Sequence, residues 1–167
     1  ASLEEVQNRA PGQRVVVSPH HVLAAAQAEH TVAVAGYPTG RHHTLIKASE
    51  ARLAIQSGAS EVWVSLDETV ADANAVLSEL IAIREACPEP ARLGLIVPEA
   101  VGADAADAAD VAVTAAQPAG YQRLIVRRSE AAAADRADSG AGEEGMKKGP
   151  ALAAAKLPVL EFPAALV

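Results

Sequence analysis

Charged and hydroxyl side chains follow three apolar runs that read as buried strands. The run at residues 61–66 is followed by an aspartate, the run at 92–97 by a glutamate two positions on, and the run at 123–126 by two arginines and a serine. The carboxyl ends of parallel strands share one rim of a sheet, where α/β proteins bind their ligands. Neighbouring arginines can hold a carboxylate or phosphate through paired hydrogen bonds. We therefore predict that this rim binds an anionic metabolite through Asp67, Glu99, Arg127, Arg128 and Ser129.

A second interpretation applies to Arg127 and Arg128. Both can form a solvated or ion-paired rim that holds no ligand. No catalytic residue can be assigned from these strand-end residues alone.

The elements that would position this rim are strands and helices in regular alternation. Apolar runs lie at residues 15–17, 31–36, 61–66, 92–97, 123–126 and 157–162, and segments with helical periodicity lie at 20–30, 43–58, 70–86, 103–117 and 150–156. Strand followed by helix, repeated about six times, is typical of parallel βαβ units. The predicted fold class is α/β, either a closed or nearly closed (β/α) barrel or an open doubly wound sheet.

Residues 131–150 interrupt this alternation with charges and glycines and no apolar stripe. We predict a mobile loop there. With 167 residues, the chain is predicted to form one domain over 1–167.

Composition excludes several classes of function. A formal charge of −7 argues against a nucleic-acid partner, which needs a stripe of lysine and arginine. No apolar run approaches the ~18 residues of a membrane span, and the first residues lack a signal peptide's pattern. Cys87 is the only cysteine, which favours a reducing compartment. We therefore expect a cytoplasmic protein. No glycine-rich nucleotide loop and no convincing metal-ligand spacing occurs, so we expect no cofactor and no metal.

The stretch AGYPTGRHHTLIKASE, at residues 35–50, is predicted to form a turn from a strand into a helix. Gly36 and Gly40 permit backbone angles that side chains forbid, and the proline between them stiffens the turn from strand to helix. Gly58 is expected to close that helix. Lys47 and Glu50 are three residues apart, and we expect them to form a surface or helix–helix ion pair.

The spacing in this region resembles the deoxyribose-phosphate aldolase family. The matching positions are Gly36-Tyr-Pro-Thr-Gly40, Lys47, Glu50, Ala54-Ile55, Gly58-Ala59 and Glu61-Val62, preceded by Val17-Ser18-Pro19. The match is specific over residues 14–66 and extends by element order to about residue 128. The resemblance implies a TIM-like (β/α) barrel, incomplete here with about six parallel βα units that correspond to the family's second to seventh strands. It also implies a homo-oligomer or a partner chain that covers the open sheet edges.

The family reversibly cleaves 2-deoxyribose 5-phosphate to acetaldehyde and glyceraldehyde 3-phosphate through a lysine Schiff base. By alignment, that lysine position falls on Val126 or on Arg127, and the family's strand-end aspartate falls on Trp63. Valine has no nitrogen and a guanidinium stays protonated, so neither can attack a carbonyl. A relocated nucleophile would have to be another lysine, from the set Lys47, Lys147, Lys148 and Lys156.

The resemblance therefore implies a deoxyribose-phosphate aldolase-like protein, with a small phosphorylated sugar as its ligand and with its catalytic positions replaced. The alternative is a non-catalytic relative that binds another anionic metabolite or a partner subunit. An unrelated nucleotide-binding protein ranks last.

Overall fold

A computed structural model describes residues 1–99, 103–127 and 150–162. The strands are β1 (Arg14–Val17), β2 (His30–Ala35), β3 (Glu61–Ser65), β4 (Arg92–Ile96), β5 (Arg123–Val126) and β6 (Val159–Glu161). The helices are α1 (Leu3–Arg9), α2 (Thr44–Gln56), α3 (Ala73–Ala86), α4 (Ala103–Ala116) and α6 (Pro150–Ala154), with 3-10 turns η1 (Pro19–His21) and η2 (Leu23–Ala25).

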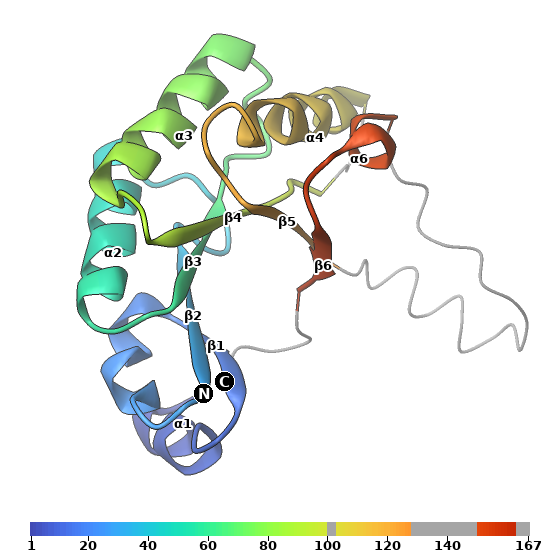
Figure 1. Cartoon of the computed structure of the whole chain (residues 1–167). Coiled ribbons are helices and arrows are strands. Elements are labelled where there is room, and N and C mark those ends of the chain that lie inside the picture. The colour runs from blue at the N-terminus through green and yellow to red at the C-terminus, as the bar shows by residue number, and fades with distance from the viewer. Residues whose placement is uncertain (100–102, 128–149, 163–167) are drawn as a thin grey trace, which may run out of the picture.

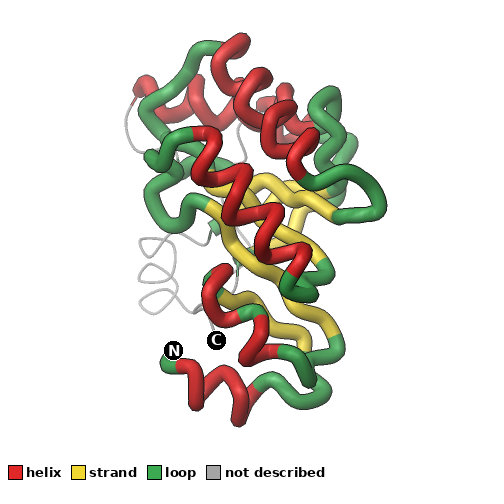
Figure 2. The backbone as a smooth tube through the Cα atoms, turned by 90° about the vertical axis from the view of Figure 1, so that its left-hand side faces the viewer, coloured by secondary structure: helices red, strands yellow, loops and turns green. Residues whose placement is uncertain are grey.

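The six strands form one parallel sheet in the order β1-β2-β3-β4-β5-β6. Figure 1 shows this sheet curled like half of a barrel, with α2, α3 and α4 on its outer side, and Figure 2 shows the same two layers from the side. The strand order follows the chain order, as it does in a (β/α) barrel and not in a doubly wound sheet. The prediction of an incomplete, TIM-like α/β barrel is confirmed.

Alternation along the strands separates two apolar layers. The larger cluster lies between the sheet and the helices and includes Val17, Leu80, Ile83, Leu95 and Leu124. The smaller cluster lies on the other, concave face and consists of Val32, Val34, Trp63, Ile96, Ile125 and Phe162. The concave face is therefore packed with side chains and is not a hollow pore.

The helices begin at residues that cap them. Asp72 precedes α3, and its Oδ1 accepts a hydrogen bond from the Ala75 N–H at 2.7 Å. Ser2 and Glu5 form a reciprocal capping box at the start of α1. The sequence analysis missed α1, although serine followed three residues later by glutamate is a known start signal.

The segment after β1 differs from its prediction. Residues 20–30 were expected to form one helix, but the chain makes the two short turns η1 and η2 before β2 begins. The carbonyl of Ala25 accepts a hydrogen bond from Thr31 Oγ1 at 3.3 Å, which ties the end of η2 directly to β2. The prediction of a helix here was wrong because this tertiary contact outweighed the helix propensity of the alanines.

Two further expectations concern the ends of elements. Gly58, with φ of 106°, follows α2 as predicted. The predicted loop at 131–150 lies outside the described residues except for Pro150, where α6 begins. None of the helices in the described ranges is long and apolar enough to cross a membrane.

Candidate functional site

The loop after β2 is shaped by two glycines that tolerate no side chain. Gly36 and Gly40 have φ of 71° and 68°. A Cβ on Gly40 would lie 2.0 Å from the backbone carbon of Leu66, and one on Gly36 would lie 2.5 Å from Cδ of Lys47. The loop therefore packs directly against the end of β3 and against α2.

The side chain of Lys47 supports this loop through hydrogen bonds. Its side chain is 1% exposed, and its Nζ donates to the carbonyl oxygens of Gly40 at 2.6 Å and Ser65 at 3.4 Å. The ammonium also pairs with the carboxylate of Glu79 on α3. The ammonium of Lys47 is therefore used in structural contacts behind the rim and is not available to a ligand.

Lys47 does not form the expected ion pair with Glu50, so that prediction of its partner was wrong. Glu50 instead accepts a hydrogen bond from the Gly36 N–H through Oε2 at 2.8 Å. A helix–helix ion pair does form, but with Glu79, which the sequence separates from Lys47 by a strand and a loop. No local spacing signals a partner at that separation, because the packing of α2 on α3 brings the two together.

Asp67 lies in the loop after β3, as predicted, within a small polar network. Its Oδ1 accepts from the N–H of Thr69 at 2.9 Å and from Oγ1 of Thr69 at 2.7 Å, and lies 3.5 Å from Nε of Arg41. Burial raises the pKa of Asp67, but the Thr69 hydrogen bonds and the charge of Arg41 outweigh it, so the pKa lies below its usual value. Arg41, which the sequence analysis did not single out, also lies 3.9 Å from Glu68.

Arg127 and Glu99 meet at the rim, since Nε of Arg127 lies 3.3 Å from Oε1 of Glu99. The ion-paired interpretation of Arg127 therefore applies to its Nε, while the two terminal amines of the guanidinium can still donate to a ligand. The structure thus joins Arg127 with Glu99, and Asp67 with Arg41 instead. Arg128 and Ser129 lie outside the described residues.

The alternation of β5 shows which way its last residues face. Ile125 belongs to the concave cluster, whereas Val126 belongs to the cluster under the helices. By the same alternation, Arg127, which follows β5, is expected on the concave side. Of the two positions that alignment allowed, Val126 therefore faces the helices.

Trp63 faces the same interior and takes part in an aromatic group. Its ring centroid lies 5.8 Å from that of Phe162, and the ring of Tyr37 stacks on Phe162 at 5.1 Å with 9° between the planes. These are three of the four aromatic residues of the chain. Trp63 is therefore part of the apolar packing of the concave face.

The described lysines do not reach this interior. Lys47 is held in the scaffold, and Lys156 is exposed and precedes β6, at the amino end of the strands. Lys147 and Lys148 lie outside the described residues.

His43 caps α2, because its Nδ1 accepts from the Leu45 N–H at 3.2 Å. The described ranges contain no group of three or more side chains arranged to hold a metal ion.

Comparison with curated proteins finds deoxyribose-phosphate aldolases, although no family model matches the chain. The chain is 55% identical over 76 residues to the enzyme of Corynebacterium glutamicum, which covers 44% of this chain and 34% of that one. It is 44% identical over 88 residues to that of Corynebacterium jeikeium, which covers 51% and 35%. It is 40% identical over 95 residues to that of Nocardia farcinica, which covers 55% and 43%. The matches thus span between about a third and two fifths of these relatives' length.

Solved structures give the same fold. A structure described as QR15, an aldolase, superimposes with a TM-score of 0.64 at 23% identity, over 75% of this chain and 61% of that one. The tetrameric deoxyribose phosphate aldolase of Aeropyrum pernix gives a TM-score of 0.62 at 21% identity, over 75% and 58%. At these identities the likeness concerns the fold alone. Taken with the partial sequence matches, it shows that the chain is similar to deoxyribose-phosphate aldolases in part of its sequence and in its barrel fold.

Proposed function

We propose that this protein is a deoxyribose-phosphate aldolase-like protein that binds a small phosphorylated sugar at the carboxyl ends of its strands without forming a Schiff base on β5. The observation that carries the proposal is the contact between Arg127 and Glu99 at the carboxyl ends of the strands, with Trp63 in the concave apolar cluster. By alignment, the family's lysine position would fall on Arg127 and its aspartate position on Trp63. The surrounding loop, with Gly36, Gly40 and Lys47, keeps the family's spacing.

The chemistry of these residues favours binding over covalent catalysis. The family's reaction begins when a neutral amine attacks the sugar carbonyl and water leaves, which forms an imine. A guanidinium stays protonated and cannot make this attack. Arg127 can instead donate two hydrogen bonds to a phosphate, and Glu99 at 3.3 Å would hold its Nε and so orient it.

The other predicted rim residues complete this proposal. Arg128 and Ser129 would add donors for the phosphate, because both follow Arg127 directly. Asp67, held ionised by Thr69 and Arg41, would accept hydrogen bonds from sugar hydroxyls. A non-catalytic relative that binds another anionic metabolite would use the same groups.

Reductive trapping tests the proposal directly. The full chain is incubated with 2-deoxyribose 5-phosphate and sodium borohydride, and its mass is measured, while acetaldehyde release is assayed in parallel. We expect no adduct and no acetaldehyde, and we expect a rise in Tm with the sugar phosphate that Arg127→Gln removes. Arg52→Gln, an exposed arginine on α2, is the matched control and should respond like the wild type. A flat response of the wild type to sugar phosphates would contradict the rim site.

An active aldolase is the second candidate, favoured by the 55% identity to the enzyme of Corynebacterium glutamicum. This candidate requires a relocated amine, from Lys147, Lys148 or Lys156. An adduct mapped by peptide mass spectrometry to one of these lysines, and lost in its arginine variant, would establish it and overturn the binding-only proposal.

The sheet edges suggest a partner for the proposed protein. Within the described residues, β1 and β6 each pair with a single strand. Unpaired parallel edges favour association, and we propose that a second copy or another chain covers them in a cytoplasmic assembly. Molecular mass in solution, by light scattering, tests this assembly, and a strictly monomeric chain would contradict it.

A further inference from the structure

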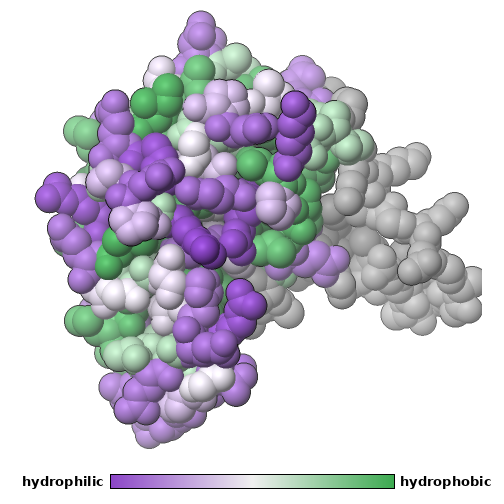
Figure 3. Space-filling view, in the orientation of Figure 1, coloured by the Kyte–Doolittle hydropathy of each residue, from purple (hydrophilic) through white to green (hydrophobic). Residues whose placement is uncertain are grey.

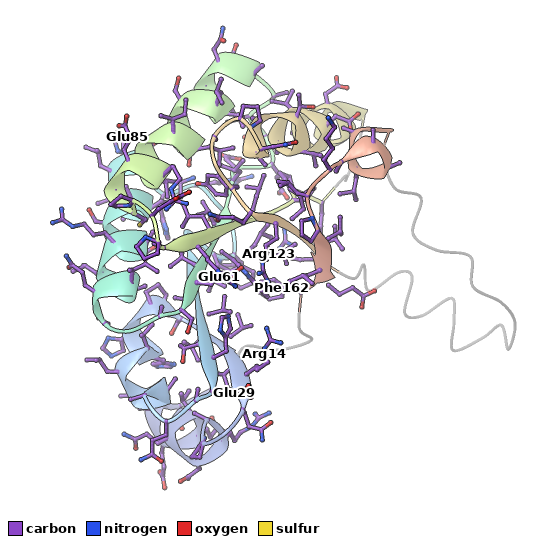
Figure 4. The ribbon with its side chains drawn as sticks, viewed as in Figure 1. Arg14, Glu29, Glu61, Glu85, Arg123 and Phe162 are labelled. Atoms are coloured by element: carbon purple, nitrogen blue, oxygen red, sulfur yellow. The ribbon has the colours of Figure 1, made fainter. Side chains whose placement is uncertain are left out.

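The amino ends of the strands carry a second polar cluster, opposite the rim. Glu61 opens β3 and is 0% exposed. Its Oε1 accepts from Nε1 of Trp63 at 2.6 Å and lies 3.0 Å from Nε of Arg123, the first residue of β5. The other oxygen, Oε2, lies 3.8 Å from Nε2 of His30, the first residue of β2. Figure 4 shows Glu61 and Arg123 side by side in the middle of the sheet. One buried carboxylate therefore connects three strands.

Arg14 and Arg92 extend this cluster to β1 and β4. The strand register pairs Arg14 with His30 and Arg92 with Glu61. Arg14 lies two residues before Val16, which packs on the concave cluster, so alternation places it on the same face. Arg92 lies four residues before Ile96 and shares that face for the same reason. Figure 3 shows strongly hydrophilic side chains gathered over the part of the sheet where β3 and β4 lie.

The first residues of the strands are thus mostly basic. In chain order they are Arg14, His30, Glu61, Arg92, Arg123 and Val159. Three arginines and a histidine therefore accompany the single glutamate among these first residues. This is unusual for a chain with a formal charge of −7, in which acidic residues outnumber basic ones.

Glu61 orients Arg123 and leaves most of its donors available. The contact uses Nε, so both terminal amines of the guanidinium remain, and the side chain is 20% exposed. Among the described residues, Arg14 and Arg92 have no carboxylate within ion-pair distance. Glu29 precedes His30, and its backbone N–H donates to the carbonyl of Gln13, the residue before Arg14, at 2.8 Å; Figure 4 labels Glu29 and Arg14. An arginine fixed by a buried carboxylate, with an unpaired arginine on the neighbouring strand, is preorganised to bind an anion.

We propose that the amino ends of β1, β2, β4 and β5 form a binding site for a small polyvalent phosphate anion. Adjacent strands are about 4.8 Å apart, so Arg92 and Arg123, on neighbouring strands, can grip different oxygens of one diphosphate-sized ligand. Arg14 lies three strands from Arg92 on the same face. The site lies at the opposite end of the strands from Arg127 and does not depend on the rim function.

Calorimetric titration of the full chain with inorganic pyrophosphate tests this site, against potassium chloride at matched ionic strength. We expect the double variant R14Q/R92Q to weaken binding about tenfold or more, because two charge-assisted contacts are removed. Both side chains are exposed, so folding should persist. Glu29→Gln removes an opposing charge and should tighten binding. Arg52→Gln should bind like the wild type, and the rim variant Arg127→Gln should keep the binding event that R14Q/R92Q weakens.

Three results would overturn the proposal. The first is a wild type that shows no heat of binding beyond the salt control. The second is equal affinity in R14Q/R92Q and R52Q. The third is loss of binding in R127Q, which would assign pyrophosphate to the rim and leave the proposed function intact. If R14Q/R92Q fails to fold, unchanged or weaker binding by E29Q contradicts the site by itself.

Discussion

At the scale of single residues, Lys47 and Gly40 hold the strand-end loop by opposite means. Lys47 supplies an ammonium that the carbonyls of Gly40 and Ser65 and the carboxylate of Glu79 surround. Gly40 contributes because it has no side chain, which lets the loop pack closely against the backbone at Leu66. A buried charge is stable only when its partners are complete, and a close backbone approach only when no Cβ intervenes.

Replacement of Lys47 by methionine should lower the free energy of unfolding by about 3 to 5 kcal/mol, because Glu79 loses its buried partner. Urea unfolding followed by circular dichroism measures the change. Lys156→Met is the matched control on an exposed lysine and should stay within about 0.5 kcal/mol of the wild type. Equal effects of the two variants would show that Lys47 does not hold the loop.

Replacement of Gly40 by alanine should be far more costly than the same change at Gly12. Both glycines have similar positive φ, 68° and 67°, so both variants lose about 1 to 2 kcal/mol from the left-handed backbone. Only at Gly40 would the added Cβ also lie 2.0 Å from a backbone carbon, that of Leu66, whereas a Cβ on Gly12 would meet nothing within 4 Å. Thermal unfolding of both variants tests this difference, and similar Tm values would argue against the close approach.

At the scale of elements, the loop between β3 and α3 is organised by two aspartates. Asp67 accepts from Thr69 and pairs with Arg41, while Asp72 caps α3. Both act as carboxylates that satisfy backbone N–H groups at the start of a turn or helix. The loop should therefore respond to acid.

The lowered pKa of Asp67 stabilises the folded protein at pH values above its ordinary value of 3.8, and this contribution is lost as the pH falls through the lowered value. Asp67→Asn should therefore be less stable than the wild type at pH 7, and the difference should shrink below about pH 4. Urea unfolding at pH 7, 5 and 3 measures it.

Two threonine variants control this prediction. Thr69→Val removes the hydroxyl bond to Asp67 and should flatten part of the pH dependence. Thr114→Val removes a similar hydrogen bond to the backbone carbonyl of Asp110. A backbone carbonyl does not titrate, so this variant should keep the wild-type pH profile. A pH profile of Asp67→Asn parallel to that of the wild type would refute the assignment.

At the scale of the whole molecule, the aromatic group joins parts of the sheet that are far apart in the chain. Tyr37 follows β2, Trp63 lies in β3 and Phe162 follows β6, and their rings meet on the concave face. This packing connects the first half of the half barrel to its last described strand.

Phe162→Ala should cost about 3 kcal/mol and shift the emission of Trp63 to longer wavelength, because the indole would lose its apolar neighbour. Trp63 is the only tryptophan, so the fluorescence reports this position alone. Leu160→Ala, on an exposed side chain of β6, is the control and should leave the emission unchanged. An unaltered spectrum in Phe162→Ala would mean that the group does not persist in solution.

The sequence by itself determined the alternation of strands with most of the helices, the α/β class and the loop at Gly36. These properties follow from local hydrophobic periodicity and from backbone angles that only glycine tolerates, and both can be read in a single chain. Periodicity did not distinguish a barrel from a doubly wound sheet, and the barrel was predicted from the family resemblance. The capping box at Ser2 was equally legible but was missed. The two turns after β1 were not legible, because a hydrogen bond from Thr31 to Ala25 decides them.

Only the tertiary structure decided which side chains meet. It turned Val126 toward the helices, gave Lys47 the partner Glu79, and brought His30 and Arg123 to Glu61. Spacing along the chain does not determine these contacts, because a shift of one residue in a strand turns a side chain to the other face. The distance between separate elements is likewise set by their packing, which is a property of the whole sheet.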